Sequence, residues 1–227
     1  FFFFYSTHRF NLALTLDRIP EALRHLEAAR ALFARCPWFL ECARGEALVK
    51  LGRFEEALAP LRLSGELAPA EPRPLLWRAE ALYWLGREGE SAACALDAVR
   101  AAPGAGWARA WRAQMLLWLG RYAEAEAELD AALAAQPAHA WAWGWRGAAR
   151  ALQGRYPPAL LDLRRALALD PDAHEARLFL GEVLARAGRP AAARRELDEA
   201  LRRDPGQFWA WALRARAPAQ CGAPAGA

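Results

Sequence analysis

Four cysteines and four histidines are the side chains that could act as nucleophiles, general bases or metal ligands. No two cysteines form a C-x-x-C pair and no histidine is grouped with them, so we expect no metal site. The sequence also lacks G-x-S-x-G, G-x-x-x-x-G-K-[ST] and H-E-x-x-H, which mark common hydrolases, nucleotide-binding proteins and metalloproteases. It therefore predicts a protein that is not an enzyme and holds no cofactor. The residues in question are Cys36, Cys42, Cys94, Cys221, His8, His25, His139 and His174.

The cysteines indicate the compartment, and the basic residues indicate the source. Unpaired cysteines are typical of a reducing environment, so we expect free thiols and a cytoplasmic protein. Every basic residue except Lys50 is arginine, and alanine and glycine are abundant, as in GC-rich bacterial genomes. No run of about 18 apolar residues occurs, so we expect no membrane span.

Charge is nearly balanced, with 30 basic against 26 acidic residues and a net charge of +4. A nucleic-acid-binding protein would concentrate unpaired positive charge on one face, so we expect no nucleic-acid partner. Alanine, leucine and arginine dominate and favour helices, whereas the β-branched residues that favour strands are scarce. The composition predicts an all-α protein.

Several kinds of residue recur every 34 positions. A Gly-Arg pair begins at Gly52, Gly86, Gly120, Gly154 and Gly188, and a proline follows at Pro69, Pro103, Pro137, Pro171 and Pro205. Glycine permits the left-handed conformation that ends one helix, and proline cannot continue the next. Rows of small residues in the same phase, such as Ala125, Ala159 and Ala193, allow two helices to approach closely. Each unit is therefore predicted to be a helical hairpin that must stack on its neighbours.

This pattern resembles the tetratricopeptide repeat. The signature positions are clearest in residues 140–173, at Trp143, Gly147, Gly154, Tyr156, Ala159, Ala166 and Pro171. The resemblance implies a right-handed superhelical solenoid of antiparallel hairpins. Its expected units are a degenerate repeat at 1–37, five repeats at 38–71, 72–105, 106–139, 140–173 and 174–207, a single helix at 208–217 and a disordered tail at 218–227.

Three prolines and one glycine lie inside predicted helices. Pro60 and Gly65 lie inside an expected second helix and predict that it is kinked or shortened. Pro157 and Pro190 lie at first-turn positions, where proline is tolerated.

In the family that the sequence resembles, the first helix of each hairpin lines a concave groove. Carrying these positions over one repeat at a time gives a candidate partner-binding groove that is rich in aromatic residues. Its members are Phe39, Glu46, Arg73, Glu80, Tyr83, Trp84, Trp107, Gln114, Trp118 and Trp141. Small residues such as Ala110, Gly144 and Ala148 leave space between the rings. Of the other tryptophans, we expect Trp77, Trp111 and Trp145 to pack between hairpins, and Trp143 and Trp211 to lie in the core.

Glutamates at groove positions indicate the kind of partner. Glu46, Glu80 and Glu182 would repel a terminal carboxylate, so an apolar, aromatic or proline-containing segment fits better. Arg112 and Arg146 each precede an acid by 16 positions, which predicts the structural ion pairs Arg112–Glu128 and Arg146–Asp162.

Three functions fit the sequence. The leading hypothesis is a non-catalytic protein–protein interaction scaffold that binds a peptide or protein segment in the groove. The second is a regulatory or substrate-docking segment of a larger enzyme or complex. The third is a self-assembling repeat that docks through Phe1–Phe4 or through an uncapped end at Phe208 and Trp209.

Overall fold

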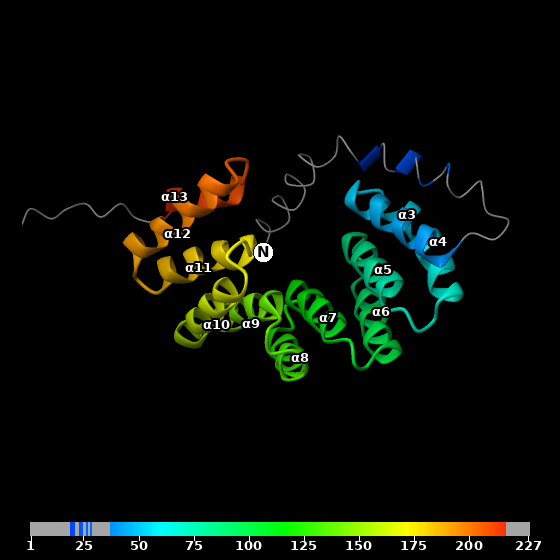
Figure 1. Ribbon diagram of the computed structural model, residues 1–227, viewed down its shortest axis with the longest axis horizontal. Coiled ribbons are helices and arrows are strands. Elements are labelled where there is room, and N and C mark those ends of the chain that lie inside the picture. The colour runs from blue at the N-terminus through cyan, green and yellow to red at the C-terminus, as the bar shows by residue number, and fades with distance from the viewer. Residues whose placement is uncertain (1–18, 21–22, 25, 27, 29–36, 217–227) are drawn as a thin grey trace, which may run out of the picture.

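The computed structural model describes residues 19–20, 23–24, 26, 28 and 37–216, and its continuous part, 37–216, is all-helical (Figure 1). Eleven helices and no strand occur in this part of the chain. They are α3 (Trp38–Lys50), α4 (Phe54–Leu67), α5 (Arg73–Trp84), α6 (Glu88–Ala101), α7 (Gly106–Trp118), α8 (Tyr122–Ala135), α9 (Ala140–Leu152), α10 (Tyr156–Leu169), α11 (His174–Arg186), α12 (Pro190–Arg203) and α13 (Phe208–Arg216). The expected unit at 1–37 and the tail at 218–227 lie almost wholly outside the described residues.

The Gly-Arg pairs end the first helix of each hairpin. The five glycines have φ between 72° and 76°, the left-handed conformation that the sequence predicts. After α3, the Gly52 amide donates to the Val49 carbonyl at 2.9 Å, and the Arg53 amide donates to the Leu48 carbonyl at 2.9 Å. These two bonds form a Schellman motif, and it recurs after α5, α7, α9 and α11.

The prolines end the second helices. The residue before each proline has left the helical conformation, as at Ala68 with φ −137° and ψ 73° and at Asp170 with φ −137° and ψ 98°. Proline disfavours helical backbone in the residue before it, so the helix stops there. Pro157 and Pro190 lie in the first turns of α10 and α12, as predicted.

Of the two outcomes expected from Pro60 and Gly65, a kinked or a shortened helix, the shortening does not occur. Helix α4 has 14 residues, the same length as α6, α8, α10 and α12. Pro60 is buried inside it. A proline removes one backbone hydrogen bond, and packing against the neighbouring helices keeps the remainder of α4 helical.

The hairpins stack into an arc (Figure 1). Helices α5, α7, α9 and α11 face its inner side, and α6, α8, α10 and α12 lie outside them. The predicted small residues Ala57, Ser91, Ala125, Ala159 and Ala193 are completely buried where the helices of each hairpin touch. The 34-residue period therefore sets both the hairpin and the face that each helix turns toward the groove.

Helix α9 and its neighbours form a network of ion pairs, which we call the charged joint: Glu126, Asp130, Arg146, Arg150, Arg155 and Asp162. The predicted Arg146–Asp162 pair has two hydrogen bonds of 2.9 Å, and Arg112 also donates to Glu128 as predicted. The buried Asp162 carboxylate accepts a further bond from Arg150 at 2.8 Å. Asp130 on α8 accepts from Arg146 at 2.7 Å. The joint thus connects α8, α9 and α10.

The prediction that Trp143 and Trp211 lie in the core is wrong for Trp211, whereas Trp143 packs against the core. Trp211 is 49% exposed and Trp143 is half-buried. The indole N–H of Trp143 donates to the Pro137 carbonyl at 2.8 Å, and that of Trp211 donates to the Pro205 carbonyl at 3.1 Å. Each ring thus reaches back to the end of the preceding repeat, which keeps it at the surface.

Arginine takes the same place in two other repeats. Arg109 donates to the Pro103 carbonyl at 3.5 Å, and Arg177 donates to the Pro171 carbonyl at 2.8 Å. This position therefore satisfies a carbonyl at the repeat boundary, which an indole or a guanidinium can do.

Two buried cysteines, Cys42 and Cys94, are free thiols. Burial is the main cause that raises the pKa of each thiol to about 11. Both are therefore protonated and unreactive near neutral pH. Within residues 37–216, no helix combines the length and apolar character that crossing a membrane requires.

Candidate functional site

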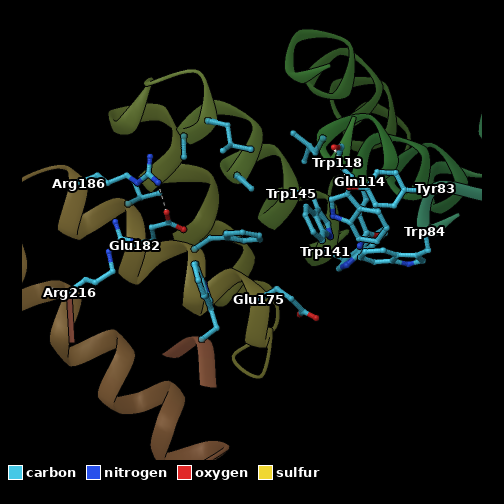
Figure 2. Close-up of a pocket in the computed structure, with 17 residues that line it drawn as sticks. Tyr83, Trp84, Gln114, Trp118, Trp141, Trp145, Glu175, Glu182, Arg186 and Arg216 are labelled. Carbon is cyan, nitrogen blue, oxygen red and sulfur yellow. Dashed lines mark hydrogen bonds and ion pairs between the residues drawn. The ribbon is translucent and has the colours of Figure 1, made fainter. Parts of the chain in front are cut away.

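The inner side of the arc contains a hollow of about 250 Å³, to which α5, α7, α9, α11 and α13 contribute side chains (Figure 2). It extends over four successive repeats and the helix that follows them. Its lining consists of Tyr83, Trp84, Gln114, Leu117, Trp118, Trp141, Trp145, Ala148, Ala151, Leu152, Glu175, Phe179, Glu182, Val183, Arg186, Trp209 and Arg216.

Aromatic rings gather at one end of the hollow, formed by Tyr83, Trp84, Trp118 and Trp141, which we call the aromatic end (Figure 2). The ring centroids of Tyr83 and Trp84 are 5.1 Å apart, those of Tyr83 and Trp118 are 5.3 Å apart, and those of Trp84 and Trp118 are 5.5 Å apart. The Tyr83 hydroxyl donates to the Trp118 carbonyl at 3.5 Å. All four side chains are half-buried, so the rings support one another and still contribute surface to the hollow.

The middle of the hollow is made by small and apolar residues of α9 and α11. Ala148 and Ala151 take up little space there. Trp145 is buried between Trp141, at 6.0 Å between centroids, and Phe179, at 5.4 Å. The predicted row of packing tryptophans is thus found between hairpins, since Trp77 also contacts Trp111 at 4.7 Å.

The other end, which we call the charged end, is formed by Glu182, Arg186 and Arg216, whereas Glu175 lies apart from them and nearer to Trp141 (Figure 2). Arg186 donates to Glu182 at 2.7 Å. Burial lowers the pKa of Arg186, but the Glu182 carboxylate more than offsets this and the net shift is upward. This end therefore offers hydrogen-bonding groups of both signs, without a large net charge.

Five of the ten predicted groove residues lie together in the hollow, and five do not. Tyr83, Trp84, Gln114, Trp118 and Trp141 line it. The lining does not include Phe39, Glu46, Arg73, Glu80 or Trp107.

These five make other contacts. Phe39 is exposed beside Trp38, and Glu46 pairs with Lys50 at 2.5 Å. Arg73 pairs with Glu71 at 2.8 Å. Glu80 is only 5% exposed, and Trp107 is half-buried against the cluster of Leu76, Ala98 and Ala108.

The burial of Glu80 and the pairing of Glu46 and Glu182 alter the electrostatic prediction. Glu80 is hidden, and each of the other two carboxylates is partly neutralised by a neighbouring base. The three glutamates therefore repel a carboxylate less than the sequence suggests.

Phe179 and Trp209 line the hollow but were absent from the predicted groove. Both have a signal in the repeat: Phe179 lies 34 residues after Trp145, and Trp209 lies 68 residues after Trp141. Extending the groove positions into α13 would have found Trp209. That residue is buried against α11 and α12, so it is not part of an open end for self-assembly.

Catalytic and metal-binding groups are not gathered here. Among the described residues, no group of three His, Cys, Asp or Glu side chains could hold a metal ion. Neither Cys42 nor Cys94 lines the hollow. Its lining is suited to non-covalent contact with a flat or apolar ligand.

Comparisons with known proteins agree with this geometry. The tetratricopeptide-repeat profile matches residues 112–163 and 153–208. The solved structure of TTC0263, a thermophilic tetratricopeptide-repeat protein of Thermus thermophilus, is 25% identical, with a TM-score of 0.70 over 79% of this chain and 98% of that chain. A search of the curated proteins found no match.

Two other solved structures share the fold at lower identity. A tetratricopeptide-repeat protein from Parabacteroides merdae is 16% identical, with a TM-score of 0.69 over 94% of this chain and 85% of that chain. YrrB, described as a protein of this class "with an unusual peptide-binding site", is 19% identical, with a TM-score of 0.54 over 78% of this chain and 91% of that chain.

Proposed function

The chain belongs to the tetratricopeptide-repeat family, and on this premise we propose that it is a non-catalytic scaffold that binds a peptide or protein segment in the hollow. The observation that carries the proposal is the aromatic end. Four aromatic rings that are only partly buried lie together on one concave surface, and such aromatic surface commonly marks a binding site. Buried aromatic anchors commonly dominate the energy of an interface.

The remainder of the hollow supports the same function. The apolar middle supplies area to bury, and the charged end supplies hydrogen-bonding groups at its rim. An apolar centre with a polar rim is the usual anatomy of a protein interface. YrrB, which shares the fold, is described as having a peptide-binding site, and this is consistent with a peptide ligand here.

The buried thiols of Cys42 and Cys94 accord with a protein that works in a reducing compartment. We therefore propose that the scaffold acts in the cytoplasm.

A displayed library of random peptides, selected on the immobilised chain, tests the function. We expect the selected peptides to bind the wild type and to lose at least tenfold in affinity for the double variant Trp118→Leu/Trp141→Leu, because these two rings line the aromatic end. Leucine keeps apolar volume, and circular dichroism would confirm that the variant is folded.

Trp211→Leu is the matched control, because it also removes an indole, but from the exposed position on α13 that does not line the hollow. Binding should be unchanged in this variant. Peptides that bind all three proteins equally would show that the hollow is not the binding site.

A further inference from the structure

We propose that the partner segment carries an arginine, and that its guanidinium lies between the Trp141 ring and the Glu175 carboxylate. This inference rests on the proposed function and names the chemistry of one residue of the partner. It comes from the charges that line the hollow, from the ion pairs among them, and from a combination of side chains that the repeats use twice elsewhere.

Glu175 differs from the other carboxylates at the predicted groove positions. Glu182 also lines the hollow, but it is bonded to Arg186 at 2.7 Å. Glu80 is only 5% exposed and does not line the hollow. The side chain of Glu175 is exposed, and no described residue forms a hydrogen bond or an ion pair with it. Its two carboxylate oxygens are therefore available to a partner.

Glu175 lies near an aromatic ring of the hollow. It is closer to Trp141 than the charged residues at the other end are (Figure 2). Trp141 is half-buried and also lines the hollow. The face of an indole ring attracts cations, and so does a carboxylate. A neutral or acidic segment laid across this place would exclude water from the Glu175 carboxylate without pairing it, which costs free energy. A basic side chain avoids this cost and complements the charge.

The charged joint shows how this chain combines an indole, a guanidinium and a carboxylate. The guanidinium carbon of Arg146 lies 4.5 Å from the centroid of the Trp143 ring. The same guanidinium donates to both carboxylate oxygens of Asp162 at 2.9 Å. One arginine thus makes a cation–π contact and a bidentate ion pair at once.

A second instance lies on α13, where the Arg214 guanidinium is 5.5 Å from the Trp211 centroid and is bonded to Asp198. In the hollow, Trp141 and Glu175 supply the ring and the carboxylate. Within residues 37–216, no arginine or lysine lies over the Trp141 ring. The partner then supplies the arginine that completes the combination.

Arginine suits this place better than lysine. Its planar guanidinium can stack on an indole and still direct two N–H groups at one carboxylate, whereas a lysine ammonium is a strongly hydrated point charge. The apolar stem of the arginine can also lie along the apolar middle of the hollow, beside Ala148.

Glu175 has a second role that a test must separate from binding. It is in the first turn of α11, where an acidic side chain stabilises the helix dipole. That role affects the stability of the helix whether or not a partner is present. Only an effect that depends on the charge of the partner's residue reports on the proposed contact.

The test continues from the peptides selected on the immobilised chain. Each selected peptide is synthesised with its arginine and with citrulline in the same position, which keeps the planar shape of the side chain but removes its charge. Fluorescence anisotropy measures the affinity of both peptides for the full-length wild type and for Glu175→Gln. Together the affinities form a double-mutant cycle, which isolates the interaction between the arginine and Glu175.

We expect arginine to recur at one position of the selected peptides. Citrulline at that position should weaken binding to the wild type about tenfold, because the ion pair is removed and the contact with the Trp141 ring is weakened. In Glu175→Gln the same replacement should weaken binding only about twofold, because the ring contact alone remains. Charge reversal in Glu175→Arg should shift the selected residue at that position from arginine to an acid.

Glu55→Gln is the matched control. Glu55 is the second residue of α4, as Glu175 is of α11, and its side chain is exposed but does not line the hollow. This variant therefore removes the same charge from the same position of a helix. The tenfold preference for arginine over citrulline should be unchanged in it, and circular dichroism would confirm that both glutamine variants are folded.

Two results would overturn the inference and leave the scaffold function standing. One is that the selected peptides depend on Trp118 and Trp141 but contain no arginine. The other is an equal effect of citrulline in the wild type and in Glu175→Gln, which would place the arginine away from Glu175. Peptides that ignore the hollow, or a selection that yields no binding peptide, would instead contradict the scaffold function itself and this inference with it.

Discussion

The hollow and the charged joint lie on opposite sides of α9, and they are built in different ways. Toward the hollow, α9 presents Trp141, which is only half-buried, and the small residue Ala148. Toward the joint, Arg146 and Arg150 are bonded to the buried carboxylate of Asp162. Under the proposed function, this helix separates recognition from stability: the joint holds the repeats together, and the hollow takes the partner.

Removing the central acid of the joint should have the largest effect on stability. Asp162→Ala leaves Arg146 and Arg150 without a carboxylate that is almost wholly buried, and we expect it to lower the free energy of unfolding by about 3 kcal/mol. Urea denaturation followed by circular dichroism measures this.

Asp198→Ala is the matched control, because Asp198 pairs with Arg214 at the surface. It should cost less than about 1 kcal/mol. Equal losses in the two variants would mean that burial of the joint does not matter.

Two glycines of α9 differ in how closely the neighbouring helices pack against them. A Cβ at Gly147 would lie 2.6 Å from the Leu163 Cγ atom and 3.2 Å from the Ala159 carbonyl oxygen. We therefore expect Gly147→Ala to cost about 1–3 kcal/mol.

At Gly144 the nearest contact of a Cβ would be an ordinary 3.4 Å to the Ala176 Cβ atom. Gly144→Ala should thus be neutral or stabilise by up to about 1 kcal/mol, because alanine favours helix. Thermal melts of the two variants compare them directly, and a loss in Gly144→Ala as large as that in Gly147→Ala would contradict this difference in packing.

The turn that ends α9 should tolerate alanine poorly for a different reason. Gly154 has φ 76° and no atom within 4 Å of an added Cβ, so Gly154→Ala tests backbone conformation alone. We expect a loss of about 1–2 kcal/mol in denaturant melts. Gly89→Ala, an uncrowded glycine inside α6, should instead stabilise the fold by up to about 1 kcal/mol. The same sign in both variants would argue against conformational strain.

The charged joint should also give a small dependence of stability on pH. Burial raises the pKa of Glu126, but hydrogen bonds from Arg150, Arg155 and Gln153 outweigh it and bring the pKa below 4.5. A lowered carboxyl pKa stabilises the folded state above the unfolded pKa, and this contribution is lost as the pH falls through the folded value.

The melting temperature of the wild type should therefore fall more steeply than that of Glu126→Gln between about pH 5 and pH 3. If the melting temperatures of the two proteins fall in parallel with pH, Glu126 does not contribute to the pH dependence of stability.

Local chemistry explains which features the sequence could predict. The glycine that ends each first helix and the proline that follows each second helix act through their own backbone, so their effect was predictable. The Arg146–Asp162 pair was predictable as well, because hairpins of constant length bring residues 16 positions apart together. Pro60 does not shorten α4, because packing around a helix can outweigh the loss of one hydrogen bond.

Position in the repeat did not by itself predict which tryptophans line the hollow and which pack elsewhere. Trp141, Trp143 and Trp145 lie two residues apart on α9, and they face the hollow, the repeat boundary and the next hairpin respectively. Trp107 and Trp141 share a repeat position, yet only Trp141 lines the hollow. The difference depends on which side chains the neighbouring repeats place beside each ring.

The sequence by itself determined the repeat length, the ends of the helices and the order of the hairpins, because these follow from backbone preferences and from a strict 34-residue period. The tertiary structure decided where the hollow lies, which five of the ten candidate residues share it, and that Glu80 is hidden. These outcomes depend on how successive hairpins rotate against one another, and that rotation is set by contacts between side chains far apart in the chain.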